Sequence, residues 1–163
     1  MNNPALFTSN TPEWYTPPDI ITAVISVMGC IDLDPCSPFS DGPVPAKKHY
    51  TIDDDGLVLP WCGRVYMNPP YGRIWQKWAR KAIKEYRIGN ATEIILLIAA
   101  RPDTRAWQEL SVFPWCGITG RLHFSGHPRA APFPSAVFYL GDNIERFKNV
   151  FGPFGPIYRA VSS

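Results

Sequence analysis

The sequence RVYMNPPYG at residues 64–72 joins an apolar strand to a rigid polar turn, and the fold is organised around it. Val65, Tyr66 and Met67 are residue types that favour a buried β-strand. Two consecutive prolines then end the strand, because proline cannot donate to a sheet ladder and fixes its own φ. An amphipathic helix is predicted to begin near Arg73. The turn therefore follows the carboxyl end of a strand, where open α/β sheets bind their ligands.

The turn offers two hydrogen-bond acceptors, the side-chain carbonyl of Asn68 and the main-chain carbonyl of Pro69. Two rigidly held acceptors can bind both hydrogens of an exocyclic –NH2 group on a nucleobase. These bonds draw the nitrogen toward tetrahedral geometry and free its lone pair, so that positioning and dipoles carry a reaction there. Tyr71 supplies an aromatic face for a planar base, worth roughly 1–3 kcal/mol by analogy with single-strand binders. The alternative interpretation is a proline-rich turn that only ends a strand.

Helix and strand patterns alternate along the chain and predict an α/β fold. Residues 93–100 are continuously apolar, which is typical of a central parallel strand buried on both faces. Thr16 is the expected N-cap of a first helix, with Pro17 in its first turn. Further strands are predicted at residues 31–35, 47–51, 112–118, 135–140 and 157–161, and further helices at residues 73–88, 104–110 and 144–151. No GxGxxG fingerprint for a nicotinamide or flavin cofactor is present.

Length and composition are those of a single ordered domain. The 163 residues suffice for one core, and we expect a flexible arm over residues 1–12 followed by one domain over residues 13–163. The four cysteines lack metal-ligand spacing, so free thiols in a reducing cytosol and no metal ion are expected. No signal peptide opens the chain and no apolar run could span a membrane. A net charge of +2 is only weak evidence for a polyanionic partner.

A second group of candidate ligand-binding residues lies in the first part of the chain. Trp14 and Tyr15 fit equally a hydrophobic staple on the first helix and a platform for an adenine ring or a methionine chain. Asp32 and Asp34 alternate with apolar residues in a predicted strand. A carboxylate at the carboxyl end of a strand is well placed to bind an α-amino group. A solvated acid in an ordinary turn is a serious alternative for Asp32.

The longest remaining polar loop covers residues 120–134. It mixes Arg, His and Phe, a composition that suits contact with nucleic acid. A plain surface loop is an equal alternative.

In this order, the motifs resemble those of the phage-type DNA N6-adenine methyltransferases, the Dam-type phage family. The resemblance covers nearly the whole chain and is carried by residues 13–17, 32–35, 55–57, 60–61, 68–72, 120–121 and 135–138. It implies a compact Rossmann-like fold that uses S-adenosylmethionine, with a mostly parallel central sheet, helices on both faces and no separate recognition domain. It also implies methyl transfer to N6 of an adenine flipped out of double-stranded DNA, in the cytoplasm of a bacterium that hosts a phage or prophage.

The resemblance assigns roles to individual residues. In the catalytic turn Asn68-Pro69-Pro70-Tyr71, Asn68 and Pro69 grip the amine and Tyr71 stacks on the target base. The residues expected to bind S-adenosylmethionine are Trp14, Tyr15, Thr16, Pro17, Asp32, Asp34, Pro35 and Asp55. Apart from the resemblance, the basic and aromatic composition of the 120–134 loop suggests it as the recognition element, and the residues expected to contact DNA are Arg73, Arg121, His123 and Arg129.

Several alternatives remain open. Cytosine N4, RNA adenine and protein glutamine also present a planar –NH2 group, although cytosine N4 enzymes more often resemble a Ser-Pro-Pro-Tyr form. A catalytically silent DNA-binding relative is a further alternative, against which the intact tetrapeptide argues. The segment Asp34–Pro38 also lacks the glycine-rich loop of many relatives in the wider superfamily. The sequence leaves the oligomeric state open and favours a monomer only slightly.

Overall fold

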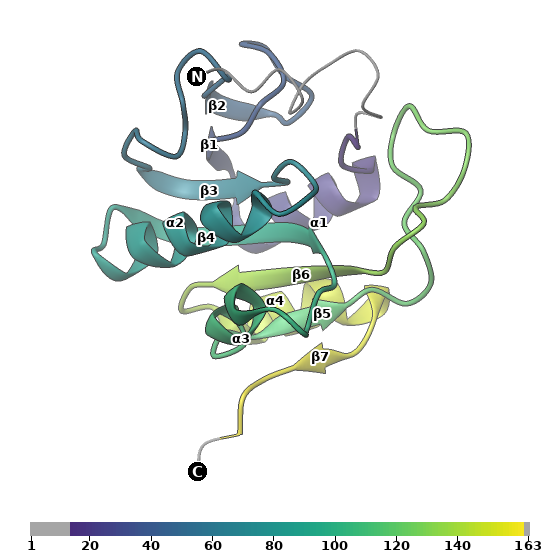
Figure 1. Ribbon diagram of the computed structural model, residues 1–163. Helices are drawn as coiled ribbons and strands as arrows, with labels where there is room; N and C mark the ends of the chain where they lie inside the picture. The colour runs from purple at the N-terminus through teal and green to yellow at the C-terminus, as the bar shows by residue number, and fades with distance from the viewer. Residues whose placement is uncertain (1–13, 162–163) are drawn as a thin grey trace.

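The computed structural model describes residues 14–161, which form one seven-stranded sheet covered by helices on both faces (Figure 1). The strands lie in the order β2-β1-β3-β4-β6-β5-β7. They are β1 (Ile31–Asp34), β2 (Ala46–His49), β3 (Gly63–Met67), β4 (Ala91–Ala99), β5 (Trp115–Gly117), β6 (Ser135–Leu140) and β7 (Ile157–Tyr158). The helices are α1 (Pro18–Met28), α2 (Trp75–Arg87), α3 (Arg105–Leu110), α4 (Ile144–Phe151) and the short 3-10 helix η2 (Gly152–Phe154).

The sheet is parallel on one side and antiparallel on the other. Strands β2, β1, β3 and β4 are paired in parallel. Strand β6 is antiparallel to both β4 and β5, and β7 is antiparallel to β5. The predicted α/β sheet with helices on both faces is therefore confirmed, and the parallel pairing is confined to the half of the sheet from β2 to β4.

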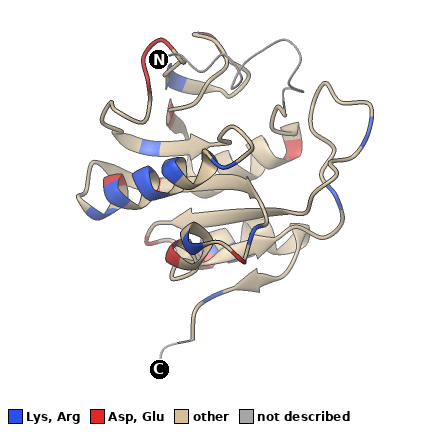
Figure 2. Ribbon diagram, in the orientation of Figure 1, with Lys and Arg blue, Asp and Glu red and all other residues tan. Residues whose placement is uncertain are grey.

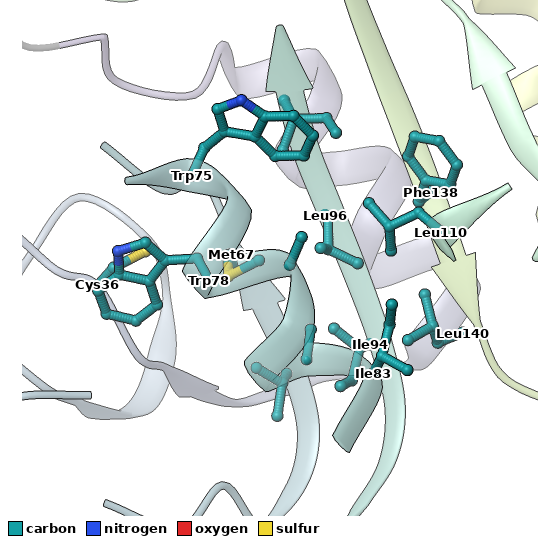
Figure 3. Packing of buried hydrophobic residues seen from close by; sticks show 14 of the residues in the cluster. Cys36, Met67, Trp75, Trp78, Ile83, Ile94, Leu96, Leu110, Phe138 and Leu140 are labelled. Atoms are coloured by element: carbon teal, nitrogen blue, oxygen red, sulfur yellow. The ribbon is translucent and has the colours of Figure 1, made fainter. Parts of the chain in front are cut away.

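Strand β4 separates two hydrophobic cores. Ile94, Leu96 and Ile98 point to the face covered by α2 and α3, where they meet residues such as Trp78 and Leu110 (Figure 3). Alternate residues of the same strand point to the face covered by α1 and α4. The continuous apolar run of this strand is needed because both of its faces are buried.

The topology brings two kinds of segment to one edge of the sheet. The carboxyl ends of β1, β3 and β4 meet there because these strands are parallel. Since β6 is antiparallel to β4, with Ser135 opposite Ala99, the loop that precedes β6 arrives at the same edge. This loop, residues 120–134, lies beside the start of α1 in Figure 1. The directions of β3, β4 and β6 thus place the Asn68 turn and the polar loop at the same edge of the sheet.

The structure revises the expected element ends. Helix α1 begins at Pro18 with Pro17 at its N-cap position, so the prediction of Thr16 as the N-cap was wrong. Helix α2 begins at Trp75 rather than near Arg73, and the last strand is limited to Ile157–Tyr158. The flexible arm predicted for residues 1–12 lies outside the described residues. Within residues 14–161, none of the helices combines the length and the apolar character that crossing a membrane requires.

Candidate active site

Asn68 follows strand β3 directly, and all polar atoms of its side chain have partners. Its amide nitrogen Nδ2 donates to the main-chain oxygen of Trp14 at 2.6 Å and lies 3.4 Å from the hydroxyl oxygen of Thr16. Its oxygen Oδ1 accepts a long hydrogen bond, 3.4 Å, from the hydroxyl of Tyr71. The segment before α1 therefore holds the nitrogen side of the carboxamide, and the oxygen side faces Tyr71.

A cavity of about 380 Å³ opens beside the residues that follow Asn68, and Tyr71, the partner of the Asn68 oxygen, lines it. Its walls come from the turn after β3, the first turn of α2, the end of β4 and the 120–134 loop. The lining residues are Pro69, Pro70, Tyr71, Gly72, Arg73, Trp75, Gln76, Ile98, Ala99, Arg101, Thr104 and Phe133. Its volume is in the range of sites that bind small molecules or a single base.

Aromatic rings form one wall of the cavity. The rings of Tyr71 and Phe133 lie against each other, with centroids 4.7 Å apart and an angle of 37° between their planes. Burial raises the pKa of Tyr71 well above its ordinary value, so its hydroxyl stays protonated and can donate. Sequence analysis did not single out Phe133. The sequence feature that could have indicated it is its position two residues before the predicted strand at residues 135–140, at the end of the polar loop.

Asp34 ends strand β1 and carries a carboxylate that is only 3% exposed. Its Oδ1 accepts a hydrogen bond from the N–H of Cys36 at 3.1 Å. Burial raises the pKa of this carboxyl from 3.8 to about 6, an effect that Cys36 and the nearby His49 reduce. Within residues 14–161 no lysine or arginine forms an ion pair with Asp34. A buried carboxylate of this kind favours a cationic ligand group.

The segment after β1 contacts both the Asn68 turn and the loop that contains Asp55. The thiol of Cys36 donates to the main-chain oxygen of Asn68 at 3.5 Å. The backbone of Gly56 packs so tightly on Pro35 that a Cβ atom at Gly56 would lie 2.0 Å from the Pro35 oxygen. Asp55 is exposed beside this contact, with a left-handed φ of 58°. The segment that follows Asp34 thus contacts the main chain of Asn68 through Cys36 and the Asp55–Gly56 turn through Pro35.

Asp32 lies at the other end of the strands. Its carboxylate accepts a hydrogen bond from the N–H of Arg64, near the start of β3, and forms an ion pair with Lys47 at 2.9 Å. The Arg64 hydrogen bond, followed by the one from Lys47, lowers the pKa of Asp32. Both carboxylate oxygens are therefore engaged by groups near the starts of β3 and β2, away from the Asn68 turn.

Trp14 is enclosed by the 120–134 loop. Its ring stacks on His127 with centroids 3.9 Å apart and makes edge contacts with Phe124 and Phe133. The main-chain oxygen of Tyr15 accepts a hydrogen bond from the N–H of Ser125 at 3.0 Å. The segment before α1 and the polar loop consequently form one packed unit.

The four residues expected to contact DNA are all exposed: Arg73, Arg121, His123 and Arg129. Arg73 lines the cavity, and the other three lie on the 120–134 loop. This loop contains no Asp or Glu, and Figure 2 shows it with blue segments, which mark Lys or Arg, and no red one. The loop is anchored by the buried side chains of Leu122 and Phe124.

Residues 5–125 match the model of the family described as DNA N-6-adenine-methyltransferase (Dam). No curated protein matches the chain significantly. Among solved structures, a dimethyladenosine transferase from Plasmodium falciparum is similar, with a TM-score of 0.48 and 15% sequence identity. That match covers 82% of this chain and 64% of the Plasmodium chain.

We predict that Asp34→Asn stabilises the unliganded protein at pH 8. Because the pKa of Asp34 is about 6 in the folded chain and 3.8 as its ordinary value, ionisation destabilises the fold as the pH rises from about 4 to 6. Two pKa units correspond to about 3 kcal/mol, which is the upper limit of the expected gain in the free energy of unfolding. Urea unfolding at pH 8 and pH 4 measures it, and the gain should vanish at pH 4.

The matched control for this prediction is Asp32→Asn. The pKa of Asp32 is lowered in the folded chain, so its ionised form stabilises the fold at pH 8 and the substitution should have the opposite sign. Equal effects of the two substitutions at pH 8 would contradict the assignment of an uncompensated charge to Asp34.

The contact of Gly56 with Pro35 predicts that Gly56→Ala destabilises the fold. The added methyl group would meet main-chain atoms of Pro35. The segment that contains Pro35 or the turn that contains Gly56 must therefore shift, at a cost of about 1–3 kcal/mol in the free energy of unfolding. Gly152→Ala is the control, because no atom lies within 4 Å of the position of its added Cβ. Urea unfolding of both variants tests the contact, and equal stability of the two would argue against it.

Proposed function

The chain belongs to the DNA N-6-adenine-methyltransferase (Dam) family, and from this we propose that it methylates N6 of a flipped-out adenine in double-stranded DNA, with S-adenosylmethionine as donor. The observation that supports this most strongly is the Asn68 side chain. Its nitrogen is bound by the protein, whereas its oxygen has only a long bond to Tyr71 beside the cavity. An acceptor in this state is suited to a substrate amine.

The proposed step begins when the adenine amine replaces the Tyr71 hydroxyl at Asn68 Oδ1. The carbonyl oxygen of Pro69 is the second acceptor, and no main-chain N–H within residues 14–161 donates to it. With both N–H bonds accepted, the nitrogen lone pair is free to form the new N–C bond. The amine nitrogen then carries a positive charge, which is relieved when one of its protons passes to solvent. The role of Asn68 and Pro69 is electrostatic positioning, without a titrating base.

The donor site is proposed to lie around Asp34. When bound, S-adenosylmethionine supplies a methyl group activated by its sulfonium, and the C–S electron pair stays on sulfur. The buried carboxylate of Asp34 fits the α-amino group of the donor, because no lysine or arginine of the described chain forms an ion pair with it. Pro35 and the Asp55–Gly56 turn are next to it and are candidates for further donor contacts.

The target base is proposed to enter between Tyr71 and Phe133. The ring centroids are 4.7 Å apart in the unliganded structure. A base stacked between two rings needs about 7 Å, since the optimal carbon–carbon contact is about 3.5 Å. Entry of the base therefore requires the 120–134 loop and the catalytic turn to separate. The exposed Arg121, His123 and Arg129 on the same loop are proposed to contact DNA phosphates.

The test of this function is methyl transfer from labelled S-adenosylmethionine to unmethylated duplex DNA, with the product nucleosides separated. We expect N6-methyladenine, and we expect Asn68→Ala to reduce transfer at least 100-fold, since removal of one polar group that stabilises developing charge costs about 10²–10³ in rate. Donor affinity should change little.

Asn143→Ala is the control, because the Asn143 side chain is exposed and forms no cap to its helix. Label only in N4-methylcytosine, RNA or protein glutamine would reassign the substrate. Substantial turnover by Asn68→Ala would refute the role of this residue.

The loop contribution is tested by Arg121→Ala and Arg129→Ala. Each substitution should weaken binding to duplex DNA and reduce the slope of log affinity against log salt concentration by about 1, while donor affinity is retained. Arg159→Ala removes an equally exposed charge beyond the last strand and serves as the control. Fluorescence anisotropy at several salt concentrations measures the effect, and unchanged DNA affinity in the loop variants would rule the loop out.

A further inference from the structure

The orientation of the Asn68 carboxamide is decided by its neighbours in the segment before α1. Oxygen and nitrogen of a carboxamide have nearly the same shape, so the group could be turned over without a steric cost. A main-chain carbonyl can only accept a hydrogen bond. The carbonyl oxygen of Trp14, 2.6 Å away, therefore requires Nδ2 rather than Oδ1 on its side.

We propose that Thr16 and the main-chain carbonyl of Trp14 are positioning groups that fix the Asn68 carboxamide with its oxygen toward the target amine. The inference rests on the proposed methyl transfer and deepens the account of its site. In the opposite orientation, the –NH2 of Asn68 would face the –NH2 of the base, and two donors cannot bond. The two contacts thus separate a productive side-chain orientation from an unproductive one.

Thr16 is supported from strand β3 itself. The hydroxyl oxygens of Thr16 and Tyr66 are 2.7 Å apart, and Tyr66 is fully buried two residues before Asn68. A buried tyrosine hydroxyl needs a partner, and Thr16 provides it. The Thr16 hydroxyl is in turn held where it can accept from Asn68 Nδ2 at 3.4 Å. The chain of contacts runs from Tyr66 through Thr16 to Asn68.

The helix itself makes no use of the Thr16 hydroxyl. Threonine just before a helix normally accepts a hydrogen bond from an N–H of the first turn. In this structure Pro17 occupies the N-cap position, and α1 has no side-chain cap. The hydroxyl is therefore directed to Tyr66 and Asn68, which argues for a role in the site rather than in helix formation.

The kinetic test compares Thr16→Val, which keeps the shape of the side chain and removes its hydroxyl, with Thr16→Ser, which keeps the hydroxyl. We expect Thr16→Val to lower kcat about tenfold, the scale of one lost hydrogen bond. The KM for DNA and the Kd for S-adenosylmethionine should stay within about twofold. Thr16→Ser should restore kcat, and Tyr66→Phe should show a smaller loss. An increase in donor Kd at unchanged kcat would overturn the inference and assign Thr16 to the donor site.

A second readout is independent of activity. In protein labelled with ¹⁵N asparagine, the Asn68 side-chain signals are assigned by their loss in Asn68→Ala. We expect the Asn68 –NH2 protons to exchange with water at least several-fold faster in Thr16→Val than in the wild type and in Thr16→Ser. Equal exchange rates in all three would overturn the inference. If wild-type protein methylates nothing, the proposed function fails, and the exchange rates still decide whether Thr16 holds Asn68.

Discussion

Burial of strand β4 on both faces is the constraint on which the rest of the structure depends. Its alternate residues belong to two different cores, so helices must cover the sheet on each side. The neighbouring strand β3 is parallel to β4 over its whole length, from Gly63 to Met67. This pairing fixes where β3 ends and therefore where Asn68 begins the turn. A rigid central strand is what gives the polar turn a defined position relative to the cavity.

The change of direction between β4 and β6 has an equally direct effect on the site. A parallel continuation would have delivered the 120–134 loop to the opposite edge of the sheet. The antiparallel pairing of Ser135 with Ala99 instead brings Phe133 against Tyr71. The same loop encloses Trp14, whose main-chain oxygen contacts Asn68. The segment before α1, the Asn68 turn and the 120–134 loop, which are distant in sequence, thus meet around the ring of Trp14.

Sequence patterns predicted the parts of this arrangement that follow from local physics. The apolar run of β4, the stripe of α2 and the proline-terminated turn each carry a periodicity or a steric rule that needs no tertiary information. The partners of the Thr16 hydroxyl could not be predicted in this way, because the local pattern is that of an N-cap and the partners are 50 and 52 residues away. Asp32 and Asp34 look alike in sequence. Only the pairing of Asp32 with Lys47 and the burial of Asp34 distinguish them.

The packing of Trp14 and Thr16 also sets an order of events in folding. Their partners lie on β3 and on the 120–134 loop, so their contacts close loops of about 50 and more than 100 residues, which are slow to form. During synthesis this segment emerges before the strand and the loop that contain its partners, so its contacts form only after those parts have emerged. The contacts that orient Asn68 join residues 14–16 to the end of β3 and can form once β3 is available, whereas the packing of Trp14 on His127 also needs the 120–134 loop. The enclosure of the Trp14 ring is therefore completed last, when almost the whole described chain is available.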